Sequence, residues 1–141
     1  MIVVERATEE DIADILAIDQ AIGAVHRSSW LVEAVRARQA LIAREGEHKL
    51  GFAVVHRHFF GQPFVELLVV HPNARRRGGG SALLAYVEKT QPGDKLFTST
   101  NQSNTVMQAL LEKRGYVRSG QIDNLDEGDP EIIYFKRLEH A

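Results

Sequence analysis

The sequence predicts an α/β (α+β) fold in which a mixed central sheet carries helices on both faces. Two observations lead to this prediction. Short apolar runs rich in β-branched residues are bounded by turn residues, which is typical of strands. Between them lie segments with apolar residues at helical spacing. In chain order these segments read β-α-α-β-β-β-α-β-α-β-β, and this alternation favours helices packed on one sheet.

The N-terminal part is predicted to hold one strand and two helices. Residues 2–6 form the strand. We expect Thr8 to cap the first helix, with acidic residues at 9–11 in its first turn, and Gly23 to end it. The two serines at 28–29 are candidate caps of the second helix. The apolar positions of the two helices are Ile12, Ile15, Leu16, Ile18, Trp30, Leu31, Ala34 and Val35.

The middle of the chain is predicted to hold three strands. Residues 40–44 and 50–59 form a hairpin around a turn at 45–47. A second turn at 61–63 leads into the run 64–70, which reads Phe-Val-Glu-Leu-Leu-Val-Val and ends before a proline. A short and nearly continuous apolar run of this kind indicates a strand buried on both faces.

The C-terminal half is predicted to continue as helix, strand, helix and two strands. The strands lie at 95–100, 116–122 and 131–136, and Asn101 or Ser103 is expected to cap the helix between the first two. The apolar positions of the two helices are Leu83, Leu84, Val87, Val106, Met107, Leu110 and Leu111.

Composition narrows the class of protein. A chain of 141 residues is long enough for one domain with a real core, which we expect to span residues 1–141. The absence of cysteine excludes a disulfide framework, a thiolate metal site and a cysteine nucleophile. A net charge of −2 and the lack of a long apolar run or a signal peptide predict a cytoplasmic protein without nucleic-acid or membrane partners.

Four histidines raise the question of a metal site. His56 and His58 would point to the same face of a strand, whereas His48 and His71 lie further along the chain. No acidic or cysteine residue stands at obvious ligand spacing from them. We therefore predict no metal and interpret them as exposed hairpin histidines.

The most informative stretch follows the central strand and reads Arg-Arg-Arg-Gly-Gly-Gly-Ser. Glycines let the backbone approach a ligand closely. The first amides of the following helix have no helical acceptor, and the helix dipole is positive there, so this end suits phosphate. Arginines add attraction and direct pairing. The predicted phosphate or pyrophosphate cradle consists of Arg75, Arg76, Arg77, Gly78, Gly79, Gly80 and Ser81.

The type of phosphate ligand follows from the glycine spacing. No G-x-x-x-x-G-K-[S/T] string occurs, and a dinucleotide motif fails because its third glycine position is Leu83. The pattern that fits is R-x-x-G-x-G, as Arg75-x-x-Gly78-x-Gly80 after a strand. It resembles the acyl-coenzyme A motif of the Gcn5-related N-acetyltransferase (GNAT) superfamily, in which loop amides hold the pyrophosphate of the coenzyme. The alternative is a solvated basic loop that caps a core helix.

A second segment, residues 104–116, is similar to the other motif of that superfamily, N-x-x-A-x-x-L-Y-E-x-x-G-F. The matching positions are Asn104, Leu110, Glu112, Gly115 and the aromatic Tyr116. The resemblance implies that Asn104 contacts the pantetheine arm or orders the helix start. The order of elements is also the GNAT order, and the resemblance covers essentially the whole chain.

The sequence departs from the second motif at Leu111, where many family members have a tyrosine that protonates the departing thiolate. Removing a general acid typically costs about 10²–10⁴ in rate, but a thiol with a pKa near ~8.5 can leave unprotonated. Candidate replacements are Tyr116, which we take first, Ser103, Tyr134 and water.

Glu66 is the candidate general base, because it is the only ionisable residue in the central strand. Burial there would raise its pKa toward a useful range. The alternative is a glutamate at the exposed start of the strand. By resemblance, the backbone N–H groups of Leu68, Val69 and Val70 polarise the thioester carbonyl and pair with the pantetheine.

The expected reaction is therefore transfer of the acetyl group of acetyl-CoA to an amine. The segment 123–131 carries five acidic residues and no Lys or Arg, so it would attract a cationic acceptor, either a small molecule or a peptide amine. Residues 24–27 correspond to the acceptor-side wall of the family. The alternative function is a non-catalytic acyl-CoA-binding or regulatory module. A homodimer is expected only by analogy.

Overall fold

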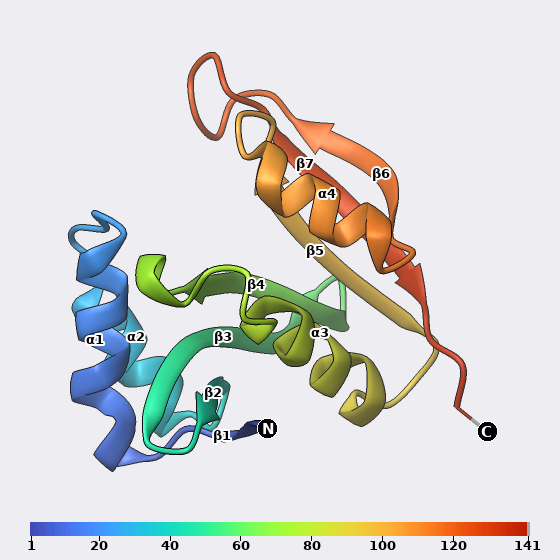
Figure 1. Ribbon diagram of the computed structural model, residues 1–141. Helices are drawn as coiled ribbons and strands as arrows, with labels where there is room; N and C mark the ends of the chain where they lie inside the picture. The colour runs from blue at the N-terminus through green and yellow to red at the C-terminus, as the bar shows by residue number, and fades with distance from the viewer. Residues whose placement is uncertain (141) are drawn as a thin grey trace. The chain divides into compact units, whose positions relative to one another are not determined.

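The computed structural model describes residues 1–140, and Figure 1 shows the order of its elements. The strands are β1 (Ile2–Arg6), β2 (Ala40–Glu45), β3 (His48–Phe59), β4 (Gln62–Val70), β5 (Lys95–Asn101), β6 (Val117–Ile122) and β7 (Glu131–Arg137). The helices are α1 (Ile12–Ala21), α2 (Ser28–Arg36), α3 (Gly79–Thr90) and α4 (Thr105–Lys113), with 3-10 turns η1 (Glu9–Asp11) and η2 (Pro72–Ala74). The predicted order of strands and α-helices is confirmed.

The seven strands form one mixed sheet in the order β1-β2-β3-β4-β5-β7-β6. Strands β4 and β5 run parallel, with Phe64 opposite Phe97 and Val65 opposite Thr98. The β1–β2, β2–β3, β5–β7 and β6–β7 pairs are antiparallel. The predicted mixed sheet is therefore confirmed.

The chain divides into two compact units. The N-terminal unit contains Met1–Val55 and Leu67–Val87, and the C-terminal unit contains His56–Glu66 and the described residues from Glu88 onward. Strands β3 and β4 and helix α3 contribute residues to both. The single domain expected from the sequence stays a prediction.

The core of the N-terminal unit forms where α1 and α2 pack on β2 and β3. The two helices lie side by side in Figure 1. The buried cluster consists of Ala7, Ile15, Ile18, Leu31, Ala34, Val35, Ala40, Ile42, Phe52, Val54 and Val69. Every residue of β2 from Ala40 to Ala43 is buried, so both faces of this strand are covered. Area removed from water at about 25 cal/mol per Å² makes this cluster the main source of stability in the unit.

A β-bulge interrupts the β2–β3 ladder. Ala43 pairs with Gly51 and Arg44 pairs with Lys49, so Leu50 is the extra residue. A bulge re-aims the side chains on its strand. The adjacent Gly51 allows a close approach of β4, because an added Cβ atom would lie 2.4 Å from the Val69 carbonyl oxygen. No larger residue fits at this position without moving a strand.

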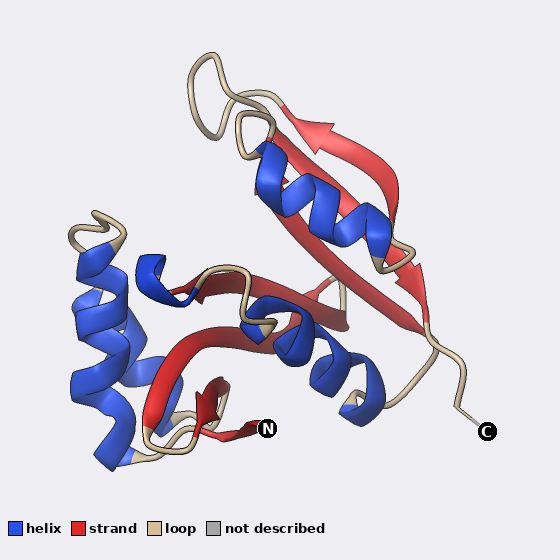
Figure 2. Cartoon of the chain, in the orientation of Figure 1, coloured by secondary structure: helices blue, strands red, loops and turns tan. Residues whose placement is uncertain are grey.

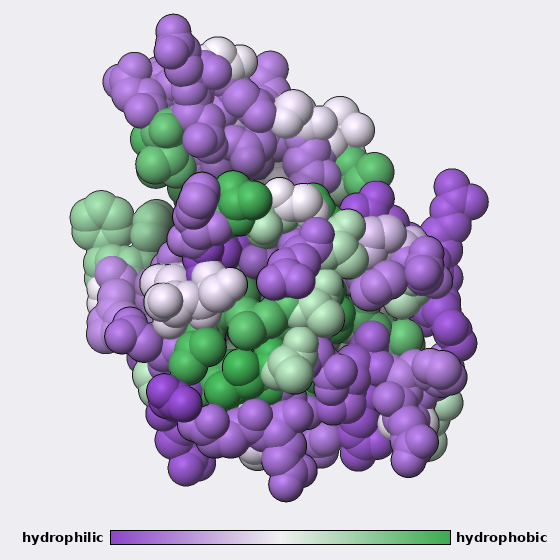
Figure 3. Space-filling model, turned by 90° about the vertical axis from the view of Figure 1, so that its left-hand side faces the viewer, coloured by the Kyte–Doolittle hydropathy of each residue, from purple (hydrophilic) through white to green (hydrophobic). Residues whose placement is uncertain are grey.

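The connection between α1 and α2 is held by a bidentate ion pair. The Arg27 guanidinium donates from Nε to Asp19 at 2.7 Å and from Nη2 at 2.5 Å. Asp19 is 4% exposed, so its carboxylate depends on this partner. Around the pair, Ile22, Val25 and Trp30 remain exposed. Figure 3 views the side on which α1 and α2 lie in Figure 1 and shows a hydrophobic area bordered by hydrophilic residues.

In the C-terminal unit, α4 covers one face of β5 and β7. Leu111 of α4 is fully buried, and the Tyr134 hydroxyl donates to Glu112 at 3.3 Å. On the other face, phenylalanine rings lie in a row from Phe59 through Phe97 to Phe135, with centroid distances of 5.2 Å at both steps. Phe97 and Phe135 lie opposite each other on adjacent strands, and such aromatic pairs stabilise sheets.

The turn between β3 and β4 is tighter than predicted. Phe60 and Gly61 both have positive φ, at 52° and 75°, as in a two-residue type I′ hairpin turn. The strand therefore begins at Gln62, and the predicted turn at 61–63 is too long. Figure 2 shows the loops that separate the strands. The expected caps Asn101 and Ser103 are also wrong, because Asn104 caps α4.

Among residues 1–140, no helix is long and apolar enough to cross a membrane. The cytoplasmic location stays a prediction.

We expect Arg27→Ala to lower the free energy of unfolding by about 2–3 kcal/mol, because it leaves the buried Asp19 carboxylate unpaired. The matched control is Arg36→Ala. Arg36 pairs with Glu9, but both side chains are more than 60% exposed (63% and 64%), so its loss should cost less than about 1 kcal/mol. Urea denaturation of both variants measures the difference, and equal losses would contradict the assignment.

Candidate functional site

The predicted pyrophosphate loop is clamped by one residue of the β-bulge. The Leu50 carbonyl oxygen accepts a hydrogen bond from the His71 N–H at 2.8 Å, where β4 ends. At the other end of the loop, an added Cβ on Gly79 would lie 3.4 Å from the Leu50 Cβ. Leu50 is 1% exposed. The position of both ends of the loop is therefore set by a buried core residue.

The three arginines of the loop have different roles. Arg77 donates to Glu45 of β2 at 2.6 Å and so ties the loop to the sheet. Arg75 and Arg76 are exposed, and within residues 1–140 their side chains have no hydrogen bond or ion pair. These two guanidinium groups are therefore available to an anion.

The backbone of the loop leads directly into α3. Gly78 has φ of +91°, a conformation that strongly favours glycine. The first helical hydrogen bond runs from Ala82 N to Gly78 O at 2.9 Å, so the amides of Gly79 and Gly80 precede it and have no acceptor inside the helix. Both glycines are buried. These amides, the helix dipole and two exposed arginines fit a phosphate group.

Leu68, Val69 and Val70 form the end of β4 that leads into this loop. Val69 is 4% exposed and belongs to the core of the N-terminal unit. Burial of this strand fixes the path of its backbone. The prediction concerns the backbone N–H groups of these residues, so this path sets where those groups lie.

Asn104 lies at the start of α4. Its Oδ1 accepts a hydrogen bond from the Met107 N–H at 3.1 Å, as an N-cap residue does. The structure thus gives Asn104 the helix-ordering role, and the predicted contact with pantetheine stays a prediction.

Glu66 lies on β4 in the C-terminal unit. Its side chain is 44% exposed, so the expectation of a buried glutamate is wrong. Successive side chains of a strand point to opposite faces, so Glu66 lies on the face of Phe64 and not on that of Val65, and its carboxylate reaches solvent there. Its carboxylate oxygen Oε1 lies 2.7 Å from His56 Nε2. His56 is only 13% exposed, so the interpretation of this histidine as an exposed one is also wrong.

Tyr116 is held in a buried charge cluster. It is 2% exposed, and its hydroxyl donates to Glu88 at 2.9 Å. Glu88 also accepts from Arg114 at 2.8 Å and from Lys136 at 3.1 Å. Burial would raise the pKa of Glu88, but these hydrogen bonds outweigh it and lower the pKa. Burial and the Glu88 carboxylate raise the pKa of Tyr116, which makes it a poor proton donor.

The other candidate acids are also bound to carboxylates. The Ser103 hydroxyl donates to Asp129 at 2.6 Å. Tyr134 donates to Glu112, and burial together with that carboxylate raises the pKa of Tyr134. Leu111, at the position of the family's tyrosine, is part of the core. Each of the protein hydroxyls considered therefore has a structural hydrogen bond.

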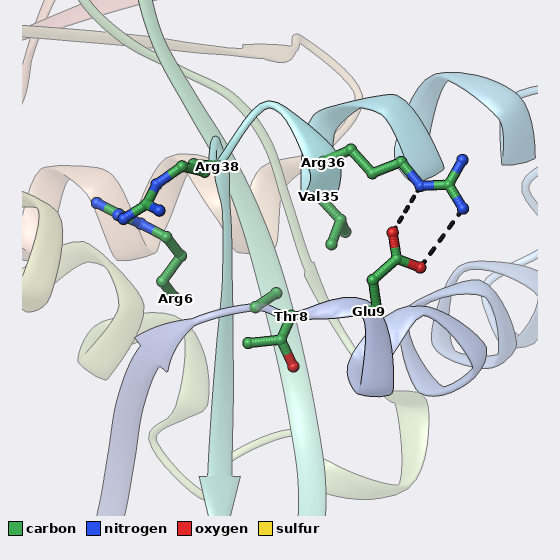
Figure 4. Close-up of a pocket in the computed structure, with 7 residues that line it drawn as sticks. Arg6, Thr8, Glu9, Val35, Arg36 and Arg38 are labelled. Carbon is green, nitrogen blue, oxygen red and sulfur yellow. Dashed lines mark hydrogen bonds and ion pairs between the residues drawn. The ribbon is translucent and has the colours of Figure 1, made fainter.

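A hollow of the N-terminal unit lies elsewhere. It has a volume of about 500 Å³ and is lined by Arg6, Ala7, Thr8, Glu9, Val35, Arg36 and Arg38. Figure 4 shows the Glu9–Arg36 pair on one side and the Arg6 and Arg38 side chains on the other. It contains no predicted site residue. Among residues 1–140, no group of three or more histidine or acidic residues is arranged to hold a metal ion.

The sequence matches the family profile described as Acetyltransferase (GNAT) family over residues 9–116. The chain belongs to the GNAT acetyltransferase family. A GNAT-family acetyltransferase from Bacillus cereus ATCC 10987 is 36% identical to it, with 99% of each chain covered and a TM-score of 0.94. No curated protein matches the chain.

Two more distant structures share the GNAT fold. The ribosomal-protein-S18-alanine N-acetyltransferase from Escherichia coli is 16% identical, with 100% of this chain and 96% of that chain covered and a TM-score of 0.85. The yncA protein from Salmonella typhimurium, solved with its cofactor acetyl-CoA, is 17% identical, with 99% and 95% covered and a TM-score of 0.78. Both establish likeness of fold alone.

Sequence reasoning missed two groups of residues in this GNAT acetyltransferase. The first is His56, whose contact with Glu66 no spacing rule indicates. The second is Glu88 on α3 with its two cationic partners, Arg114 directly after α4 and Lys136 on β7. The only sequence signal for either was an ionisable residue among apolar neighbours.

We expect Gly78→Ala to weaken binding of coenzyme A by at least about tenfold and to cost about 1 kcal/mol of stability, because alanine is strained at this φ. Gly93→Ala is the matched control, since Gly93 has φ of +88° with nothing within 4 Å of an added Cβ. Calorimetric titration with coenzyme A and urea denaturation measure both effects. Equal weakening in the two variants would contradict a role of the loop in binding.

For Tyr116→Phe we expect a loss of about 1–2 kcal/mol in the free energy of unfolding, because one hydrogen bond to a carboxylate disappears. The kcat should stay within about twofold of the parent, since the hydroxyl is committed to Glu88. Tyr134→Phe serves as the comparison, because it removes a similar hydroxyl–carboxylate bond. A fall in kcat of about 10²–10⁴ in one variant alone would identify that tyrosine as the acid.

Proposed function

We propose that this protein is an N-acetyltransferase that transfers the acetyl group of acetyl-CoA directly to an amine. The observation that carries the proposal is the loop at the start of α3, with glycine in the left-handed conformation at Gly78 and exposed guanidinium groups at Arg75 and Arg76. The yncA protein of the same fold binds acetyl-CoA, and the Escherichia coli protein acetylates an alanine of ribosomal protein S18. Acetyl-CoA supplies the acetyl group as a thioester.

The loop residues would hold the pyrophosphate of the coenzyme. Backbone amides of Gly79 and Gly80 face the anion, and Arg75 and Arg76 pair with it. The backbone N–H groups of Leu68, Val69 and Val70 would hold the pantetheine and polarise the thioester carbonyl. Asn104 would add a contact from its side-chain amide.

Glu66 would act as the general base. The acceptor nitrogen forms a bond to the thioester carbonyl carbon, and the proton lost by nitrogen passes to the Glu66 carboxylate. The bond from carbon to sulfur then breaks, and coenzyme A leaves as a thiolate. Exposure of 44% leaves the Glu66 carboxylate open to an acceptor.

No protein acid is needed for the last step. Tyr116 was the first candidate, and its hydroxyl is bound to Glu88. Thiolate departure followed by protonation from water is consistent with a thiol pKa near ~8.5. We therefore withdraw Tyr116 as the acid and propose water in its place.

The acceptor would be a cationic amine of a small molecule or peptide. In the acidic segment 123–131, Asp126 accepts from the Asn101 amide, and Asp129 accepts from Ser103. Glu131 accepts from the Ser99 hydroxyl at 2.6 Å. These donors are neutral, so they leave the negative charge of the segment uncompensated. The uncompensated negative charge of this acidic segment would attract cations.

The alternative is a GNAT-like module that binds acyl-CoA without turnover, which the core position of Leu111 favours. Homodimer formation stays a prediction by analogy. Both alternatives bind acyl-CoA, but only the acetyltransferase transfers the acetyl group. An activity assay therefore distinguishes them.

We expect acetyl-CoA at about 100 times its Kd to add roughly 2.7 kcal/mol to stability, a rise of several degrees in Tm, whereas ATP and NAD give no comparable shift. A panel of amines should then show acetyl-CoA-dependent thiol release. Glu66→Gln should keep the thermal shift and lower kcat/KM by about 10²–10⁴.

The outcomes distinguish the alternatives. A thermal shift without thiol release for any amine would favour the binding module. No shift at saturating acetyl-CoA would overturn the coenzyme site. Full activity of Glu66→Gln would remove Glu66 from the role of base.

A further inference from the structure

His56 and Glu66 form a carboxylate–imidazole pair in the C-terminal unit. Nε2 of His56 lies 2.7 Å from Oε1 of Glu66. The histidine side chain is 13% exposed and the glutamate side chain 44%. A hydrogen bond that is partly shielded from water on the histidine side holds its geometry better than a fully exposed pair.

The hydrogen bonds identify which nitrogen of His56 carries the proton. The His58 backbone N–H donates to His56 Nδ1 at 2.9 Å. An N–H group is only a donor, so Nδ1 must be the acceptor and carries no proton. Nε2 of the neutral ring then carries the hydrogen and donates it to Glu66. Adding a proton at Nδ1 would break the bond to His58.

Neighbouring rings fix the orientation of the imidazole. The His56 ring stacks on the His58 ring at a centroid distance of 5.3 Å, and the Phe64 ring lies at 5.7 Å. Phe64 in turn stacks on Phe59 at 4.6 Å. Phe64 precedes Glu66 by two residues on β4, so both side chains leave the same face of the strand. The stacked rings of His58, Phe64 and Phe59 therefore support the His56–Glu66 pair.

We propose that His56 is a positioning residue for Glu66, an inference that rests on the proposed function. Its Nε2–H holds Oε1, so that Oε2 faces the acceptor and takes the proton of the attacking amine. Within residues 1–140, no other hydrogen bond or ion pair to Glu66 is found. Without His56 the exposed carboxylate would sample several rotamers, and few of them are productive.

The test uses three variants of the full chain in the thiol-release assay with the amine turned over fastest. His56→Phe keeps the ring stack and removes the hydrogen bond, so we expect kcat to fall roughly ten- to hundredfold while KM for acetyl-CoA stays unchanged. His56→Gln can still donate an N–H and should recover most of kcat. His48→Phe is the matched control, because His48 is an exposed histidine at the other end of the same strand, and its kcat should stay within about twofold of the parent.

A double-mutant cycle separates positioning from a general structural effect. In a Glu66→Gln background, His56→Phe should cause no further loss, because the residue that it positions is already inactive. If His56→Phe keeps full kcat while Glu66→Gln does not, the positioning role is overturned and the proposed function stands. If Glu66→Gln is fully active, the proposed base itself fails.

Imidazole nitrogen NMR tests the pair without activity. We expect Nε2 of His56 to carry the proton and Nδ1 to be bare, and we expect the Nε2–H proton signal to move in Glu66→Ala but not in His48→Phe. A protonated Nδ1 in the native protein, or a signal that does not respond to loss of Glu66, would overturn the inference even if no amine were turned over.

Discussion

The geometry of the N-terminal unit depends on the β-bulge at Leu50. One buried residue accepts the hydrogen bond of His71 where β4 ends and lies against Gly79 where α3 begins. The loop between these points is exposed, and an exposed loop with several glycines would otherwise lose its shape to chain entropy. The core fixes both ends of the loop. Only its middle therefore needs a local stabilising interaction, which the Arg77–Glu45 ion pair provides. Binding an anion then requires little further ordering.

The C-terminal unit uses its ionisable residues in two different ways. Glu88 accepts hydrogen bonds from Arg114, Tyr116 and Lys136, and every partner is used inside the cluster. A buried carboxylate with this many donors stays ionised, and its role is structural. Glu66 is half exposed with one neutral partner. A carboxylate with a fixed oxygen and an open oxygen is suited to taking a proton, which is why the two glutamates are assigned different roles.

The sequence predicts the order of the elements well, because apolar periodicity reports burial and burial builds this sheet. Its glycine spacing also predicts a phosphate loop, and phosphate binding there stays a prediction. Contacts that depend on strand register are not predicted from the sequence. Uninterrupted pairing around the Phe60–Gly61 turn would set Val55, not His56, opposite Glu66. The ring of His56 instead receives the His58 N–H and reaches the carboxylate. The contact between His56 and Glu66 leaves no periodic signal in the sequence, and neither does the assembly of the Glu88 cluster from distant segments.

The chemistry of acetyl transfer explains why a GNAT acetyltransferase can lack the usual tyrosine. An alkyl amine with a pKa near ~10.4 is unprotonated in only about one molecule in 2,500 at pH 7, which corresponds to roughly 4.6 kcal/mol. A departing thiolate with a pKa near ~8.5 lies only about 2 kcal/mol above its protonated form at the same pH. The larger barrier is therefore at the amine, where a base is required. In the proposed mechanism the Glu66–His56 pair and the uncompensated charge of the acidic segment would both act on that amine, and Leu111 would affect only the smaller of the two free-energy costs.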